Sequence, residues 1–389
     1  MAVRFDQHHL AYCTNIHPAE SWADTFHVLE SDVLAVRDQL QEKGVIEGPF
    51  SIGLRLSARA AKELLEGGGL ADFASWLGKT QTYVFTINGF PYGDFHGTRV
   101  KEKVYQPDWT TVERLNYTKQ LFDIIAVLAP EDCGGSVSTL PGSFKEFGAD
   151  EGVIFRHLEE CAVYIDALAQ KSGKDLHLGL EPEPLGHFEN TAETLAFFER
   201  FLATVNDVDL VKRRIGLNYD CCHFALEFDQ CRPSLEAFDK AGIRISKVHL
   251  SSALTFDPND ADSLESLKRF DEPTYLHQVI VSGKDGLKRV RDLPEFYQNL
   301  ESGEWTLDGQ DQARCHFHVP LYSEAAAPLG TTQSHAVDML AYRREHPDFC
   351  NHFEIETYTW GVLPDGLQSD LTSQIVREFQ WVLNTVSSQ

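Results

Sequence analysis

Residues 215–223 read IGLNYDCCH, a short apolar run that ends in side chains able to do chemistry. The segments 177–181 (HLGLE), 246–250 (SKVHL) and 353–357 (FEIET) have the same form. Short apolar runs bounded by polar residues are typical of strands buried on both faces. Amphipathic segments stand between most of these runs, and such alternation predicts a parallel sheet covered by helices.

Four further strands and their helices are predicted on the N-terminal side of these runs. The strands are expected at Leu10–Ile16, Phe50–Leu56, Thr82–Ile87 and Gly135–Leu140. Helices are expected from Ser21 (with Asp24 completing a capping box), over 57–65, 111–128 and 151–170, from Thr191, and over 370–386. Eight strands, most of them followed by a predicted helix, predict an α/β fold, a single (β/α)8 TIM barrel over residues 1–389.

About 100 residues, 251–350, separate the seventh and eighth predicted strands, far more than a plain connection needs. This segment is predicted to be an insertion with elements of its own. No shift in composition indicates a second domain, so the chain is expected to be one barrel domain that carries this insertion.

The composition narrows the classes of function. The formal net charge is -25, which repels polyphosphate and argues against a nucleic-acid partner. No apolar run reaches the length of a membrane span and the N-terminus lacks the pattern of a secretory signal, so we expect no direct membrane insertion. The 8 cysteines are scattered, which is typical of free thiols in a reducing cytoplasm.

Chemically capable side chains end four consecutive predicted strands: Glu181, Asp220, His249 and Glu356. The carboxyl ends of barrel strands meet at one mouth, so these side chains are expected to converge. Carboxylates brought together repel one another unless a proton or a cation lies between them. Oxygen ligands with one imidazole suit Mn²⁺, Mg²⁺, Co²⁺ or Zn²⁺, so one divalent metal ion is predicted at this mouth.

The order of these residues resembles the xylose-isomerase-like barrels, which include ketose 3-epimerases, related sugar isomerases and endonuclease IV. The resemblance covers mainly residues 175–357. It implies that Glu181 and Glu356 are catalytic and exchange a proton beside a metal-held carbonyl group. The matching residues are Glu181, Asp220 with His223, His249, His316 or His318, and Glu356.

His316 and His318 stand where epimerases commonly have a histidine and an arginine. These two imidazoles are therefore candidates for contact with the substrate or for additional metal ligands. His223 is expected to donate to a substrate hydroxyl. The fourth strand ends in Thr139, Leu140 and Pro141 without a histidine, which argues against a three-zinc phosphodiesterase such as endonuclease IV.

Polar residues also follow the first three strands. The residues predicted to form walls of the substrate pocket are Asn15, His17, Arg55, Asn88, Tyr92 and His96. The alternative is that they join loops to one another through hydrogen bonds.

Motifs in the first third of the chain resemble a narrower family, the EboE-type metabolite traffic proteins of the Ebo gene cluster. The motifs are 12–22 (YCTNIHPAESW), 53–57 (GLRLS), 88–92 (NGFPY) and 104–109 (VYQPDW). The resemblance implies a role in the traffic of secondary-metabolite precursors. Expected partners are a small-molecule substrate, a second copy in a homodimer, and other Ebo-cluster proteins.

Three functions remain open from the sequence. The first is a metal-dependent isomerase or epimerase of a small polyhydroxylated carbonyl compound. The second is a metal-dependent hydrolase or lyase that uses the same ligands, and the third is a metabolite-binding or traffic protein without turnover. An intact set of four ligands favours an enzyme, since clustered carboxylates are costly without a cation.

Overall fold

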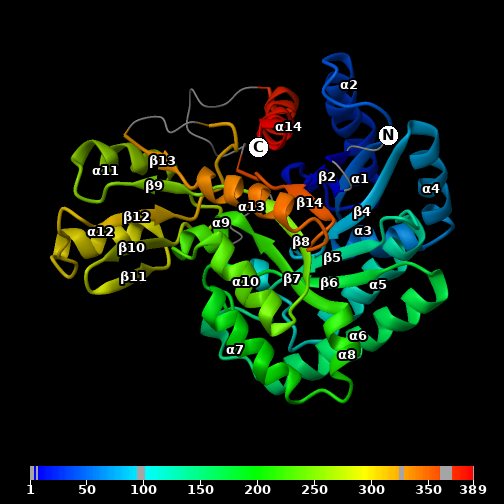
Figure 1. The fold of residues 1–389 in the computed structure, drawn as a ribbon, viewed down its shortest axis with the longest axis horizontal. Helices are drawn as coiled ribbons and strands as arrows, with labels where there is room; N and C mark the ends of the chain where they lie inside the picture. The colour runs from blue at the N-terminus through cyan, green and yellow to red at the C-terminus, as the bar shows by residue number, and fades with distance from the viewer. Residues whose placement is uncertain (1–3, 6–7, 94–100, 324–327, 360–369, 389) are drawn as a thin grey trace.

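The computed structural model describes residues 4–5, 8–93, 101–323, 328–359 and 370–388, and it confirms the predicted barrel (Figure 1). Within these residues, eight parallel strands follow one another in the order β2-β14-β8-β7-β6-β5-β4-β3. A parallel bridge between Cys13 and Gly53 brings β2 beside β3, so the sheet is nearly closed. The strands are β2 (His8–Tyr12), β3 (Phe50–Arg55), β4 (Thr82–Asn88), β5 (Gly135–Thr139), β6 (Leu176–Leu180), β7 (Ile215–Asp220), β8 (Ile245–Leu250) and β14 (His352–Ile355).

The first strand is shorter than predicted. β2 ends at Tyr12, and Thr14–Ile16 forms a 3-10 turn instead of continuing the strand. A short strand β1 (Arg4–Phe5) pairs antiparallel to β2. The turn lies at the mouth of the barrel, where Asn15 donates to Glu356, the residue directly after β14 and more than 300 residues further along the chain.

Helices cover the outside of the barrel (Figure 1). The predicted capping box is confirmed, because Ser21 Oγ accepts the backbone N–H of Asp24 and the Asp24 carboxylate accepts the N–H of Ser21. The helices are α1 (Trp22–Val28), α2 (Leu34–Glu42), α3 (Ala58–Leu65), α4 (Gly69–Thr80), α5 (Val112–Leu128), α6 (Glu151–Ser172), α7 (Thr191–Leu202), α8 (Val208–Arg214), α9 (Cys221–Leu226), α10 (Cys231–Ala241), α13 (Gln333–Glu345) and α14 (Leu371–Ser388). Of the helices in the described ranges, none is long and apolar enough to cross a membrane.

The segment between β8 and β14 carries a second, antiparallel sheet with the strand order β11-β10-β12-β9-β13. In Figure 1 it lies beside the barrel, in yellow-green to orange. Backbone hydrogen bonds from Val319 to Ser252 (2.8 Å) and from Thr332 to Ala253 (2.9 Å) join it to the end of β8. Its elements are β9 (Leu254–Phe256), α11 (Ala261–Leu267), β10 (Val279–Gly283), β11 (Gly286–Val290), α12 (Leu293–Ser302), β12 (Gln312–Cys315) and β13 (Gly330–Thr331).

Candidate metal centre

Asp220 is the last residue of β7 and also the N-cap of α9. Its Oδ1 accepts the backbone N–H of His223 at 3.0 Å and the hydroxyl of Ser251 at 2.7 Å. These two bonds fix the direction of the carboxylate. Oδ2 has no hydrogen-bond partner among the described residues, and it is the oxygen that faces His249.

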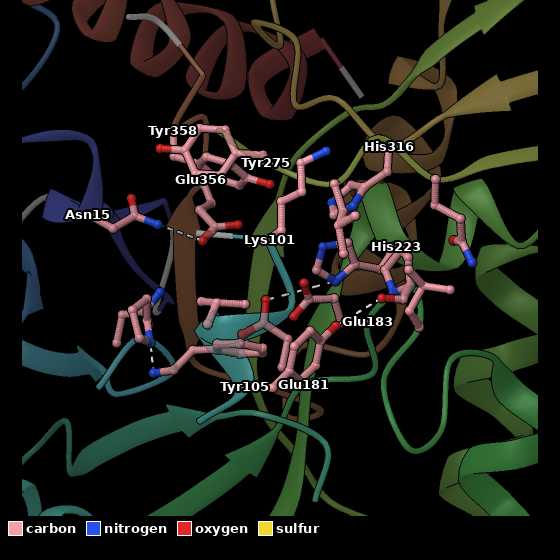
Figure 2. A pocket seen from close by; sticks show the side chains of 18 residues that line it. Asn15, Lys101, Tyr105, Glu181, Glu183, His223, Tyr275, His316, Glu356 and Tyr358 are labelled. Carbon is pink, nitrogen blue, oxygen red and sulfur yellow. Dashed lines mark hydrogen bonds and ion pairs between the residues drawn. The ribbon is translucent and has the colours of Figure 1, made fainter. Parts of the chain in front are cut away.

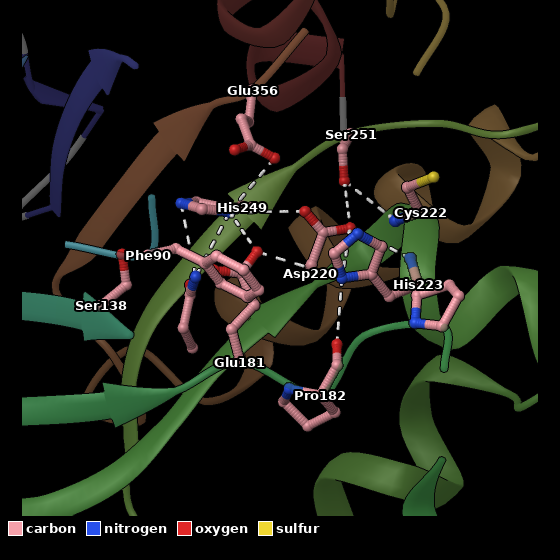
Figure 3. Close-up of polar contacts among 12 residues, drawn as sticks. Phe90, Ser138, Glu181, Pro182, Asp220, Cys222, His223, His249, Ser251 and Glu356 are labelled. Carbon is pink, nitrogen blue, oxygen red and sulfur yellow. Dashed lines mark hydrogen bonds and ion pairs between the residues drawn. The ribbon is translucent and has the colours of Figure 1, made fainter. Parts of the chain in front are cut away.

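The structure brings the four predicted ligands together at the mouth of the barrel (Figure 3). One ligand atom from each of Glu181, Asp220, His249 and Glu356 lies within 4.8 Å of the others. His249 Nδ1 lies 3.1 Å from Glu181 Oε1, 3.4 Å from Asp220 Oδ2 and 3.4 Å from Glu356 Oε2. Three carboxylates therefore surround one imidazole nitrogen.

All four side chains are buried, and their electrostatics favour a cation. Burial disfavours a charged imidazole, but the carboxylates of Glu356 and Glu181 raise the pKa of His249 well above its usual value. Burial likewise disfavours ionisation of Asp220, but the neighbouring imidazoles of His223 and His249 hold the pKa of Asp220 well below its usual range.

The centre fits a divalent ion. Within the described part of the chain, Glu181 Oε2, Asp220 Oδ2 and Glu356 Oε2 are buried without a hydrogen-bond partner. Buried carboxylate oxygens without partners are costly. Three such oxygens and one imidazole nitrogen are the donors that Mn²⁺, Zn²⁺, Co²⁺ and Mg²⁺ accept. A bound cation would replace the proton that His249 otherwise takes up.

A buried ion pair between Lys247 and Glu354 lies beside Nε2 of His249. His249 Nε2 donates to Glu354 Oε2 at 2.9 Å, and the ammonium of Lys247 lies 2.6 Å from the same oxygen. Lys247 also donates to Ser138 Oγ at 3.1 Å. A metal-binding histidine commonly donates its second N–H to a carboxylate, which fixes the ring and leaves the other nitrogen for the ion. Here that nitrogen is Nδ1, the one that faces the three carboxylates.

Sequence reasoning did not find this ion pair, although a signal was present. Lys247 precedes His249 by two residues, and Glu354 precedes Glu356 by two. Side chains two positions apart in a strand point to the same face, so both charged residues had to lie inside the barrel. Gly53 makes room for the carboxylate, because a Cβ at that position would lie 1.9 Å from Glu354 Oε1.

A cavity of about 70 Å³ lies against the two glutamates of the centre (Figure 2). Glu181 and Glu356 line it, whereas Asp220 and His249 do not. The remaining lining residues come from several barrel loops and from the insertion: Asn15, Asn88, Phe90, Pro91, Lys101, Val104, Tyr105, Glu183, Pro184, Leu185, His223, Tyr275, Leu276, Gln278, His316 and Tyr358.

The cavity wall contains carboxyl chemistry beyond the metal ligands. Burial, together with the charges of Glu181 and Glu356, raises the pKa of Glu183 well above its usual value. A carboxyl group held in its neutral form can donate a hydrogen bond to a ligand oxygen.

The structure places only some of the predicted substrate-binding residues on the cavity wall. Asn15, Asn88, His223 and His316 lie on it, and Asn15 Nδ2 donates to Glu356 Oε1 at 2.9 Å. His318 lies behind the wall, where Nδ1 donates to the backbone carbonyl of Glu356 at 2.9 Å.

Of the residues predicted to form the pocket wall, His17, Arg55 and Tyr92 are not among those that line the cavity. The ring of His17 is hydrogen-bonded to Tyr12 at 3.0 Å. The guanidinium of Arg55 forms an ion pair with Glu20 at 3.0 Å and donates to the carbonyl of Gly93 at 2.6 Å, so it joins loops together. His96 lies outside the described residues.

Several lining residues were not predicted as ligand contacts. Tyr275, Gln278 and Tyr358 reach the cavity from the insertion and from the loop after β14, and Lys101 reaches it from the loop after β4. The rule that strand ends form the site does not identify residues on long loops. Tertiary contacts alone bring them there.

The chain matches no protein-family model and no curated protein. Solved structures similar to it include a xylose isomerase domain protein from Alicyclobacillus acidocaldarius, which is 14% identical with a TM-score of 0.48 over 97% of each chain. The IolI protein with a binding zinc atom is 14% identical with a TM-score of 0.47, over 97% of this chain and 98% of that one. The 3-keto-D-glucoside 4-epimerase YcjR from E. coli is 11% identical with a TM-score of 0.44, over 97% and 98%.

The identities and TM-scores of these neighbours are too low to decide a substrate or a reaction for this chain. The barrel assignment rests on the strand order itself. The comparisons do not support the resemblance to the Ebo-cluster proteins.

Proposed function

We propose that this protein is a metal-dependent isomerase or epimerase that acts on a small polyhydroxylated carbonyl compound. One observation carries the proposal. Of the four convergent ligands, Glu181 and Glu356 also line the cavity, while Asp220 and His249 lie behind them. Two carboxylates at the boundary between ion and ligand are suited to move protons of a ligand that the ion holds.

A divalent cation in this centre would bind adjacent carbonyl and hydroxyl oxygens and make the neighbouring C–H more acidic. The protein's own part is to hold two bases in place. Glu181 follows β6 and Glu356 follows β14, with β7 and β8 between them in the sheet, so the carboxylates reach the cavity from different directions. One of them takes a proton from carbon and the other returns one.

The surrounding residues favour a neutral, hydroxyl-rich ligand. Glu181, Glu183 and Glu356 bring three carboxyl groups to the cavity. Among the described lining residues Lys101 is the one lysine, and its ammonium is already paired with the carboxylate of Asp292. A polyanionic ligand would be repelled here, whereas sugar hydroxyls find both hydrogen-bond donors and acceptors.

Solvent exchange tests the proposal more directly than product formation, because exchange needs only the first half of the reaction. Proton NMR in heavy water with ketoses, inososes and cyclic polyols would detect deuterium at the carbon beside the carbonyl. We expect exchange by the wild type and its loss in Glu181→Gln and Glu356→Gln, since an amide does not take up a proton at neutral pH. Glu265→Gln, at an exposed surface position, is the matched control and should exchange normally.

The outcomes separate the three functions. Exchange that persists in both cavity variants would contradict the proton-transfer roles. Consumption of a compound without incorporation of deuterium would indicate a hydrolase or a lyase. Binding without exchange across the panel would favour the finer proposal drawn from the motif resemblance, a metabolite-binding role in secondary-metabolite traffic with other Ebo-cluster proteins as partners.

A further inference from the structure

The last helix, α14, carries a buried carboxyl group beside the loop that follows β14 (Figure 1). This group belongs to Glu378, and the described residues supply no charged partner for it. Burial raises the pKa of Glu378 from the usual 4.5 to about 7, so burial outweighs the hydrogen bonds that lower the pKa. Burying a carboxyl group without a countercharge is unfavourable, which indicates that Glu378 is retained for the contacts that it makes.

One oxygen of Glu378 accepts hydrogen bonds from two segments that are distant in the sequence. The hydroxyl of Thr357 donates to Oε1 at 2.7 Å, and the backbone N–H of Leu321 donates to the same oxygen at 3.0 Å. Thr357 directly follows the candidate ligand Glu356, whereas Leu321 lies between β12 and β13 of the insertion. Glu378 therefore ties the loop after β14 to the insertion.

The same two segments are also joined to each other. His318 Nδ1 donates to the carbonyl oxygen of Glu356 at 2.9 Å, and the hydroxyl of Thr359 donates to the carbonyl oxygen of His318. The hydroxyl of Tyr322 donates to Gln374 Oε1 on α14 at 3.0 Å. The two segments and α14 thus form one hydrogen-bonded unit.

This unit continues the support of Glu356 beyond the sheet. The N–H of Glu356 donates to the carbonyl oxygen of Leu250 on β8 at 3.1 Å, which extends the pairing of the strands by one residue. β14 itself ends at Ile355, and the residues from 356 to 359 form neither a strand nor a helix. The hydrogen bond from Thr357 to Glu378 is therefore the side-chain anchor directly after Glu356.

We propose that Glu378 is a positioning residue for Glu356. By accepting hydrogen bonds from Thr357 and Leu321, it holds the chain after β14 where the Glu356 carboxylate reaches both the metal centre and the cavity. The inference rests on the metal centre and on the role proposed for Glu356, and it requires no particular substrate. Removing a group that supports a metal ligand typically weakens metal binding by about 10–100-fold.

The affinity of metal-free protein for Zn²⁺, measured by competition with a chromogenic chelator, tests this role. Thr357→Val removes the hydroxyl and Glu378→Met removes the acceptor, so each should bind Zn²⁺ about tenfold more weakly while the circular dichroism spectrum stays that of the wild type. Glu378→Gln keeps an oxygen that accepts both hydrogen bonds and should retain the affinity of the wild type. Thr118→Val is the matched control and should also retain it, because this buried hydroxyl donates within α5 at 2.9 Å.

Two further measurements separate a specific link from a general loss of stability. The double variant Thr357→Val with Glu378→Met should bind Zn²⁺ no more weakly than Glu378→Met alone, because both changes remove the same hydrogen bond. In metal-free protein, amide hydrogen exchange of peptides covering residues 352–359 should be faster in Thr357→Val than in Thr118→Val. If Glu378→Met does not fold, Thr357→Val decides the question by itself.

The outcomes distinguish this inference from the proposed function. Wild-type Zn²⁺ affinity in Thr357→Val would overturn the positioning role, and so would equal losses in Thr357→Val and Thr118→Val. A wild type that binds Zn²⁺ but exchanges no substrate C–H would contradict the proposed reaction, while weaker Zn²⁺ binding by Thr357→Val would still support the positioning role. A wild type that binds no Zn²⁺ would overturn the metal centre and this inference together.

Discussion

Lys247→Met tests whether the buried ion pair of Lys247 and Glu354, beside His249, stabilises the protein. Lys247 and Glu354 are both fully buried, with 2.6 Å between the ammonium nitrogen and Glu354 Oε2. Methionine is similar in length to lysine but carries no charge. In the wild type, Glu354 Oε1 has no hydrogen-bond partner among the described residues. In the variant, the Glu354 carboxylate therefore keeps one hydrogen bond there, from His249 to Oε2. Removing one member of a buried ion pair costs about 3–5 kcal/mol.

The pKa of Glu354 gives an independent magnitude. Burial raises this pKa, but Lys247 and the hydrogen bond from His249 lower it by more. The pKa of Glu354 therefore falls from the usual 4.5 to about 2. That difference corresponds to about 3 kcal/mol, because a tenfold change in the acid constant is worth about 1.4 kcal/mol. Since the folded-state pKa is the lower one, this stabilisation is present above pH 4.5 and is lost as the pH falls from 4.5 towards 2.

Urea unfolding at pH 7, followed by circular dichroism with a chelator present, measures the effect without a contribution from bound metal. We expect Lys247→Met to lower the free energy of unfolding by about 3–4 kcal/mol. Adding Glu354→Gln should recover more than half of this loss, because no buried charge is then left alone. Lys268→Met is the matched control, and it should unfold like the wild type because its ion pair with Glu265 is exposed.

Two results would refute this reasoning. One is a Lys247→Met protein with the unfolding free energy of the wild type. The other is a double variant no more stable than Lys247→Met, which would mean that the lysine contributes by packing and not by its charge.

Three further predictions concern the same region and the opposite end of the barrel. Gly53→Ala should lower the free energy of unfolding by about 1–3 kcal/mol, because the added Cβ would collide with the Glu354 carboxylate. The control Gly78→Ala lies in a helix with open space around it and should not lower the free energy of unfolding, and thermal melts compare the two variants. Burial lowers the pKa of His352 to about 3, below the 6.5 of the unfolded chain, so stability falls as the pH drops from 6.5 towards 3. Relative to His352→Gln, the wild type should therefore lose about 1.4 kcal/mol between pH 7.5 and pH 5.5 in urea unfolding, and equal losses in the two proteins would contradict the assignment. Asp220→Asn should weaken divalent-metal binding by at least about tenfold while the circular dichroism spectrum stays that of the wild type, because barrel stability lies in the strand interior; full metal occupancy in this variant would remove Asp220 from the ligand set.

The convergence of the four candidate ligands could be predicted from the sequence because their positions depend on a local rule. Glu181 and Glu356 directly follow apolar runs, and parallel barrel strands all end at the same mouth. Asp220 stands three residues before His223, which is the spacing of a helix cap, and the structure contains that cap. Knowing which segments are strands and where each strand ends was sufficient to predict that these residues lie at the mouth of the barrel.

The tertiary structure decided what depends on contacts between distant segments. Lys247 meets Glu354, more than 100 residues further along, because β8 and β14 are neighbours in the nearly closed sheet. Gln278 reaches the cavity because the insertion folds into a sheet of its own and packs against the mouth. No periodicity in a sequence defines the path of a connection of about 100 residues, since that path is set by which surfaces bury one another. The sequence alone thus predicted which four side chains converge at the mouth of the barrel, and long-range packing determined the ion pair beside His249 and the loops that line the cavity.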